Sequence, residues 1–520
     1  MAYTDNLRLI TRASDNKPLP PHVVVWEPIA GSSQEFALDS RASHTLYTGS
    51  RGPGKTDTQL MRFARNVGKG YDAAWRGIIF DREYKNLDDL VAKSKKWYPR
   101  IFKSHCKFQE SKGDYKWVWD TGEELLFRVI KKKSDYDNYH GHEYPFIGWN
   151  ELTKYPSSEL YDMMMSCNRS SWTQEKDSSK DKFGNYTIPP IPLETFSTCN
   201  SSGSGHRWVK ARFIDVAPYG KMVFKTTNVF DPKTKTRVDV TRSQVTFFGS
   251  YKENIYLDTA YVAELENISD PNRRKSWLEG SWDVVSGGAF DDLWKRHIHV
   301  VPRFVVPQNW YLDRSFDWGS SSPFSVGWWA EANGEEVTLL DGSKWTPVRG
   351  SLIRAHEWYG ADPVLINVGL KKSAGDIAKG IKAKEIQLMT AGWFTKQPYG
   401  GPADNQIGQE REVDVEKIKD KMSDEGILWT DSIKTGGSRR NGMQLMRDRL
   451  EAAVRGEGPG VYFMDHCEAA ISQIPVLPRD EDDPDDVDTE AEDHTWDETR
   501  YRILAGIERT AKEVKVLFAA

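Results

Sequence analysis

The sequence contains few cysteines and no long apolar segment. Only four cysteines occur in 520 residues and none forms a CxxC pair, which argues against a disulfide framework and favours reduced thiols in a cytosolic chain. No run of 18 apolar residues is present, so we expect no membrane span and no membrane partner. The first residues also lack the basic and apolar regions of a signal peptide.

A surplus of basic charge is lacking as well, since the formal net charge is −5. Ten of the acids lie between residues 480 and 493, a run that holds no base and that we interpret as a solvated loop. The rest of the chain has 71 Lys and Arg against 66 acids, a net charge of +5. The charge is therefore compatible with DNA contacts through local basic patches but does not require them.

Aromatic residues and alternating elements are what the chain has in quantity. Its 20 Trp, 21 Tyr and 21 Phe supply large apolar surfaces, and 520 residues exceed one ordinary core, so two or three domains are expected. In the first half, short apolar runs alternate with amphipathic stretches, which is typical of an α/β domain. Strands are predicted at 44–49, 75–81 and 144–151, and a helix is predicted over 57–67.

The pattern loosens between residues 291 and 308, where we place a linker between a domain over 1–290 and another over 309–520. The second half begins with strands and continues with helices, an order that an RNase H-like fold would give. Its apolar segments predict consecutive antiparallel strands at 310–319, 323–331, 336–341 and 351–360, followed by a helix near 374–384.

A phosphate-binding loop follows the first of these strands. It satisfies the pattern G-x-x-x-x-G-K-[ST] in full with Gly49, Ser50, Arg51, Gly52, Pro53, Gly54, Lys55 and Thr56. Backbone N–H groups and the following helix N-terminus bind phosphate oxygens in such loops. Lys55 is expected to neutralise the β- and γ-phosphates and the Thr56 hydroxyl to ligate Mg²⁺, so the sequence predicts an ATP–Mg²⁺ site.

An ATPase also needs a carboxylate at the end of a nearby strand. The apolar run 146–149 ends in Asn150-Glu151, and we predict Glu151 as the general base or water-positioning group. Asn150 occupies the place where an aspartate commonly supports the metal, and it keeps an oxygen acceptor without the charge. The alternative is a strand that merely exits into a helix with a surface glutamate.

The surrounding sequence resembles the large terminase subunits of tailed phages. The resemblance rests on WEPIAGSSQEFALDS before LYTGSRGPGKT, on NYHGHEYPFIGWNELT, and on TFSTCNSSGSGHRWVKARF. It implies that Trp26 and Gln34 hold the adenine, for which the alternative is a core tryptophan and a turn glutamine. It also implies that Thr198 and Asn200 sense the γ-phosphate. The family usually has Asp-Glu at 150–151, so the departure puts the metal-support role in doubt.

The same resemblance implies an N-terminal P-loop ATPase domain of the RecA-like class and a C-terminal RNase H-like nuclease. Nucleases of that class use carboxylates from separate segments to hold two metal ions. By the family order these are Asp317, Asp404 and Asp497. Glu357 is a rival or auxiliary acid. His494 shares a helix face with Asp497 and is a candidate metal ligand or proton shuttle. Hard oxygen ligands favour Mg²⁺ or Mn²⁺ over zinc.

The resemblance implies a motor that drives viral double-stranded DNA into the procapsid and a nuclease that cuts concatemeric DNA. It further implies a pentameric ring on a portal protein, a small terminase subunit that selects the DNA, and a location in the host cytoplasm and transiently on the procapsid but not in the mature virion. Two alternatives remain, a helicase-nuclease of DNA repair or recombination and a nucleotide-gated scaffold with degenerate sites.

Overall fold

The computed structural model divides the chain into two compact units, residues 1–284 and 285–520. It describes residues 9–10, 24–111, 114–283, 287–362, 366–409, 416–480 and 482–519. None of the described helices combines the length and the apolar character that crossing a membrane requires.

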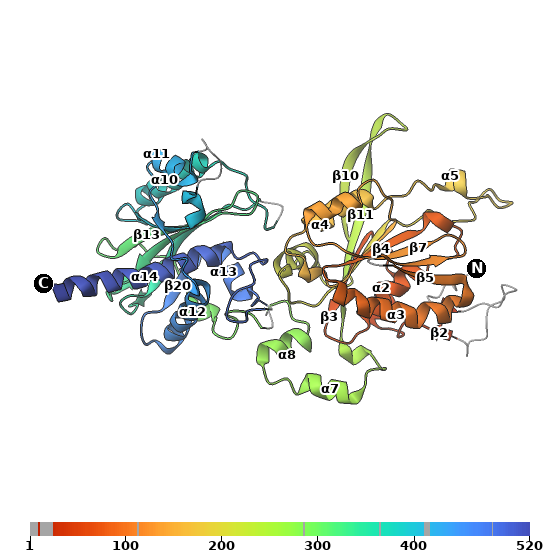
Figure 1. Cartoon of the computed structure of the whole chain (residues 1–520), viewed down its shortest axis with the longest axis horizontal. Coiled ribbons are helices and arrows are strands. Elements are labelled where there is room, and N and C mark those ends of the chain that lie inside the picture. The colour runs from red at the N-terminus through yellow and green to blue at the C-terminus, as the bar shows by residue number, and fades with distance from the viewer. Residues whose placement is uncertain are drawn as a thin grey trace. The chain divides into compact units, whose positions relative to one another are not determined.

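The first unit is built on one large twisted sheet (Figure 1). Its nine strands follow the order β10-β11-β3-β9-β8-β4-β7-β6-β5, and the strands from β11 through β7 run parallel. The strand bounds are β3 His44–Gly49, β4 Arg76–Asp81, β5 Cys106–Ser111, β6 Asp114–Trp119, β7 Glu124–Val129, β8 Phe146–Trp149, β9 Glu194–Thr198, β10 Val223–Asp231 and β11 Thr236–Gly249. A short pair, β1 Leu9–Ile10 and β2 Val24–Trp26, forms a separate ribbon.

The strand order explains how the phosphate-binding strand and the Glu151 strand come to share one edge. β9 lies between β3 and β8, the order of the RecA-like class of P-loop proteins, and the carboxyl ends of these parallel strands meet at one edge of the sheet. β3 and β4 are each buried at five of six positions, as expected for parallel strands covered on both faces. The RecA-like prediction is therefore confirmed.

Helices cover the sheet because their apolar residues recur at helical spacing. Helix α3 buries Leu87, Leu90, Val91, Tyr98 and Ile101 on one face. The helices of this unit are α1 Ser33–Asp39, α2 Lys55–Ala64, α3 Tyr84–Phe102, α4 Glu159–Met164, α5 Gln174–Asp177, α6 His206–Val209, α7 Thr259–Glu266 and α8 Pro271–Trp277. The hairpin β10–β11 extends away from the sheet (Figure 1).

The second unit contains a seven-stranded sheet in the order β12-β20-β17-β14-β13-β18-β19. β13, β14 and β17 are antiparallel, while β18 runs parallel to β13 and β19 parallel to β18, which is the RNase H-like topology that the sequence predicted. The strand bounds are β12 Val300–Val301, β13 Tyr311–Asp317, β14 Ser325–Glu331, β15 Val337–Thr338, β16 Lys344–Trp345, β17 Leu352–Tyr359, β18 Tyr399–Ala403, β19 Thr430–Asp431 and β20 Val461–Met464. The helices are α9 Arg296–His299, α10 Ala374–Thr390, α11 Ile418–Asp424, α12 Ser438–Arg455, α13 Glu468–Gln473 and α14 His494–Ala519.

Two expectations about the second half differ from the structure. The segment 291–308, expected as a linker, carries α9 and β12, and its Val301, Phe304 and Val306 are buried in the second unit's core. Pro302 directly follows β12, which is an edge strand, and a missing N–H is tolerated there. The run 336–341 leaves the main sheet, because Val337 and Thr338 pair only with β16 and β14 pairs directly with β17.

Candidate active sites

The phosphate-binding loop lies between β3 and α2, where the backbone must turn sharply. Gly54 caps α2 in the left-handed region at φ 87°, and an added Cβ would lie 2.6 Å from the Gln34 side chain. Gly49, at φ 136°, approaches Gly249 of β11 so closely that any side chain would clash with that backbone. The loop is therefore preformed around an open helix N-terminus, the geometry that binds phosphate.

Lys55, Asn200 and Glu151 form a continuous polar chain at this loop. The Lys55 ammonium donates to the Ser50 carbonyl at 2.7 Å and to Asn200 Oδ1 at 2.9 Å. Asn200 Nδ2 in turn donates to Glu151 Oε2 at 3.3 Å. Burial lowers the pKa of Lys55, and the negative charge of Glu151 opposes the shift. The lysine that would meet the phosphates is thus connected through one amide to the carboxylate that would position water.

Glu151 sits at a special backbone position. Its φ of 50° and ψ of 59° lie in the left-handed region, which a residue with a side chain seldom adopts. The conformation follows the end of β8 and turns the carboxylate toward the cavity, which Glu151 lines together with Lys55 and Thr56.

Asn150 connects the ends of three neighbouring strands. Its Nδ2 donates to Asp81 Oδ2 on β4 at 2.7 Å, and its Oδ1 accepts from the Thr198 hydroxyl on β9 at 3.3 Å. Asp81 is fully buried and also accepts from Glu83 N and Asn86 Nδ2. A carboxylate at position 150 would face the carboxylate of Asp81, so the asparagine is the residue that this arrangement can accommodate.

The cavity around the loop has a volume of about 540 Å³ and holds most, but not all, of the predicted nucleotide residues. Of these it is lined by Arg51, Gly52, Pro53, Gly54, Lys55, Thr56, Glu151 and Asn200. Trp26 instead packs in the hydrophobic core with a 7% exposed side chain, and Gln34 lies behind Gly54, where its Oε1 accepts from Ile29 N. The adenine-holding role of this pair stays a prediction.

Several lining residues carry no motif and were missed in the sequence. The cavity also includes Asp89 and Lys93 of α3 and Asn254 and Tyr261 near α7. Asn254 donates to the Gly52 carbonyl at 2.6 Å, so the segment after β11 supports the loop. A second support is Trp277, whose ring centroid lies 3.3 Å from the guanidinium carbon of Arg51.

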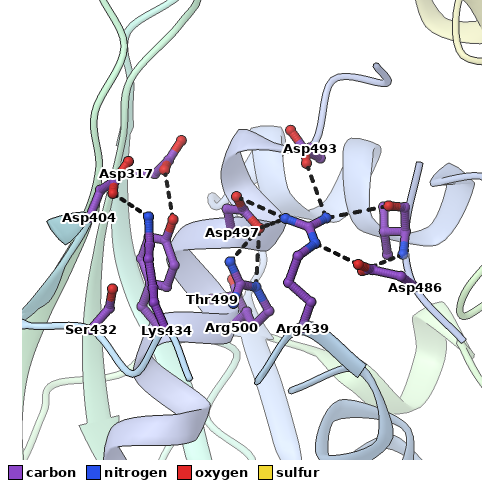
Figure 2. A network of polar contacts seen from close by, with 12 residues as sticks. Asp317, Asp404, Ser432, Lys434, Arg439, Asp486, Asp493, Asp497, Thr499 and Arg500 are labelled. Carbon is purple, nitrogen blue, oxygen red and sulfur yellow. Dashed lines mark hydrogen bonds and ion pairs between the residues drawn. The ribbon is translucent and has the colours of Figure 1, made fainter. Parts of the chain in front are cut away.

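The second unit brings three of the predicted carboxylates together (Figure 2). Asp317 ends β13, and Asp404 directly follows the parallel neighbour β18, with Phe316 paired to Ala403. Asp497 lies in the first turn of α14, which packs against both strands. The strand ends and one helix start therefore supply acids from separate chain segments.

The charges at this point are strongly coupled. Burial, with repulsion from Asp497 and Asp404, raises the pKa of Asp317 to about 6, although His494 opposes the shift. His494 Nδ1 lies 3.2 Å from Asp317 Oδ2. Burial disfavours its charged form, but Asp317 and then Asp493 outweigh this effect and raise the pKa of His494 to about 9. The histidine is therefore a charged partner of Asp317.

Basic side chains contact two of the three carboxylates (Figure 2). Lys434 forms an ion pair with Asp404, while Arg439 and Arg500 contact Asp497 at 3.2 and 3.0 Å. In the described part of the second unit, as in the first, no three His, Cys, Asp or Glu side chains are arranged to hold a metal ion.

Glu357 does not join these acids. Its carboxylate accepts from the backbone N–H groups of Ala469 and Ala470 at 2.6 and 3.1 Å and from Arg354 at 3.2 Å. It therefore binds the N-terminus of α13, and the hypothesis of a rival acid at this position is wrong.

Other polar residues of this site were missed. Tyr501 donates to Asp317 Oδ1 at 3.3 Å, and Asp493 lies beside His494 within the acidic run that was interpreted as a solvated loop. Burial, and then repulsion from Asp497, raise the pKa of Asp493 well above its ordinary value. Asp493 directly precedes His494 in the sequence, and this position could have indicated a site residue. No local sequence pattern indicates Lys434, Arg439 or Tyr501.

Comparison with known proteins identifies the family. Residues 46–296 match the family model described as "Terminase large subunit, T4likevirus-type, N-terminal". Over these matched residues the chain belongs to the terminase large-subunit family. No curated protein matches it at a significant level.

Solved terminase structures are similar to this terminase chain at low identity. The large terminase of bacteriophage HK97 is 9% identical with a TM-score of 0.41, over 96% of this chain and 97% of that one. A large terminase from a thermophilic bacteriophage is 15% identical with a TM-score of 0.35, over 91% and 97%. The nuclease domain of the P22 large terminase is 16% identical with a TM-score of 0.29, over 42% of this chain and 92% of that one.

Proposed function

We propose that this terminase chain hydrolyses ATP to translocate double-stranded DNA into the procapsid and cuts concatemeric DNA with a metal-dependent nuclease. The observation that carries the first half is the chain of contacts from Lys55 through Asn200 to Glu151. The convergence of Asp317, Asp404 and Asp497 carries the second half.

The first unit supplies the groups that phosphoryl transfer needs. Amides of the loop and the N-terminus of α2 are placed for phosphate oxygens, and Thr56 would ligate the Mg²⁺ of the bound ATP. Lys55 would contact the γ-phosphate in place of Asn200, which would leave the Asn200 amide free to reorient and Glu151 free to hold water. Asn200 thereby fits the sensing role that the family resemblance implies, with Thr198 acting through Asn150.

The acids of the second unit are the ligand type that Mg²⁺ or Mn²⁺ prefers, and they would have to move closer together to hold a pair of these ions. Asp317, Asp404 and Asp497 offer hard oxygen donors. Burial, together with repulsion from Asp497 and Asp404, raises the pKa of Asp317, a shift that bound cations would oppose. Bound metal ions would supply a nucleophilic water and would stabilise the charge of the cleaved phosphate. Within the chain, His494 holds Asp317 in place, and Lys434 and Arg439 must move off Asp404 and Asp497 before the ions bind.

The proposal extends to the partners that packaging requires. We expect a portal protein, a small terminase subunit and a homo-pentameric ring, with the chain in the host cytoplasm and transiently on the procapsid. Contacts to DNA should be mainly to phosphates and hence sensitive to salt.

Two variants test the proposal, because each should abolish the activity of one unit and leave that of the other. Lys55→Ala is expected to abolish ATP turnover and to leave Mn²⁺-dependent nicking of plasmid DNA intact. Asp317→Ala is expected to have the reverse effect, with ATP turnover retained and nicking lost. Loss of both activities in either variant would contradict the assignment of ATP hydrolysis to the first unit and of DNA cleavage to the second. ATP-dependent unwinding of a free duplex would contradict DNA packaging.

A further inference from the structure

The N-terminus of α12 combines a missing side-chain cap with two arginines. Gly437 occupies the cap position at φ 80° and supplies no side chain to satisfy the first N–H groups. The first turn holds no acid and instead carries Arg439 and Arg440, although cations are disfavoured at the positive end of a helix. Two arginines at an uncapped helix N-terminus are compatible with the helix dipole when an anion lies against them.

The anions that lie there belong to the acidic run. Asp486 accepts from Arg439 Nε at 2.6 Å, and Asp483 accepts from Arg440 Nε at 2.7 Å. Arg439 also contacts Asp493 at 3.8 Å and Asp497 at 3.2 Å, so a single guanidinium connects the acidic run to the nuclease carboxylates (Figure 2).

These groups line one cavity of about 680 Å³ beside the cluster of acids. Its charged lining consists of four acids and four bases: Asp404, Asp483, Asp486, Asp497, Lys434, Arg439, Arg440 and Arg500. The lining is thus neutral in this arrangement. With Asp483 and Asp486 withdrawn, two acids would face four bases, a net charge of +2 beside the residues proposed to cut DNA.

We propose that Arg439 and Arg440 form a binding site for the phosphates of the DNA strand to be cut, and that Asp483 and Asp486 occupy this site until DNA displaces them. The acidic run is then an intramolecular competitor whose carboxylates take the place of DNA phosphates. Its displacement also frees Arg439 from the contacts that hold it against Asp497. This inference rests on the proposed nuclease function and adds its regulation.

Binding of duplex DNA without divalent metal tests the inference, since no cutting occurs under that condition. The full-length variant Asp483→Asn/Asp486→Asn should bind a labelled duplex, followed by fluorescence anisotropy, about fivefold more tightly or better. The matched control is Asp482→Asn/Asp485→Asn, which removes the same charge from the same run. Both control side chains are exposed, and neither forms an ion pair with Arg439 or Arg440 among the described residues. Asp485 acts on Arg440 only through longer-range electrostatic attraction, so the control should gain clearly less affinity than the Asp483→Asn/Asp486→Asn variant.

A second variant probes the phosphate contact itself. Arg440 is 62% exposed, so Arg440→Gln should leave the fold intact. In the Asp483→Asn/Asp486→Asn background it should cancel part of the gain and lower the slope of log affinity against log salt by about 0.9, the value for one phosphate contact.

The failures of the inference and of the proposed function are distinguishable. Equal affinities for the two double variants, or an unchanged salt slope for Arg440→Gln, would overturn the inference while Mg²⁺-dependent cutting by the wild type still supported the nuclease. A wild-type chain that neither bound nor cut DNA would remove both.

Discussion

Replacing Asn150 by aspartate restores the residue that terminase large subunits usually carry, yet we expect the change to destabilise the first unit. The new carboxylate would face Asp81 Oδ2 across the 2.7 Å that now separates donor from acceptor, and both side chains are buried. Two charges at that distance repel by about 6 kcal/mol at an effective dielectric constant of about 20. Binding a proton at pH 7 by a carboxyl of ordinary pKa costs about 4 kcal/mol, so the variant should take up a proton instead.

Asn150→Asp should therefore lower the free energy of unfolding by up to about 4 kcal/mol. A hydrogen bond between the two carboxyl groups through the shared proton would reduce this loss to about 3 kcal/mol. For a unit of 284 residues, about 3 kcal/mol corresponds to a fall in Tm of roughly 5 °C. Differential scanning calorimetry of the full chain measures this fall, with the transition of the second unit as internal reference. The double variant Asp81→Asn/Asn150→Asp reverses the polarity of the pair and should recover most of the loss. A single variant as stable as the wild type, or a double variant no better than the single one, would refute the reasoning.

Further predictions concern single residues. Glu151→Ala should abolish ATP turnover but leave ATP binding within about twofold, and persistent hydrolysis in a coupled phosphate assay would exclude it as the base. Glu357→Gln should lower the Tm of the second unit, since it weakens the contact with the N-terminus of α13, while the nicking rate stays near that of the wild type. Burial lowers the pKa of His44 to about 4, so the unfolded chain binds the proton first as the pH falls below about 6.5. The first unit should thus lose up to about 3 kcal/mol between pH 7 and 4, and His44→Gln should lose less in denaturant titrations at each pH.

The sequence predicted the strands whose apolar pattern matches their position in the sheet. The run 44–49 before the phosphate-binding loop and the apolar run before Glu151 predicted β3 and β8, because parallel strands buried on both faces are apolar throughout. The segment 291–308 was different, since its burial depends on a partner strand, β20, more than 150 residues later. Such distant pairing leaves no mark on local composition.

The same distinction applies to the sites. Asp317 ends one strand and Asp404 follows another, and both were predicted with the family pattern. Glu357 also lies on a strand, but its carboxylate contacts the N-terminus of α13. Asn150 could not be explained without Asp81, which lies 69 residues away and becomes its neighbour only through the pairing of β4 with β8. The sequence showed the negative charge of the acidic run but not the residues that bind it. Arg439 lies beside the run only because α12 packs against α14.

The central claim, that the two sites of this chain drive DNA packaging, is tested most directly by ATP-dependent DNA encapsidation. Purified chain, portal-bearing procapsids and linear duplex DNA would be mixed with ATP, and DNA resistant to added nuclease would be measured. The account predicts protection by the wild type and by Asp317→Ala supplied with precut DNA, and none by Lys55→Ala. Protection by Lys55→Ala, or none by the wild type on procapsids that another terminase can fill, would contradict it.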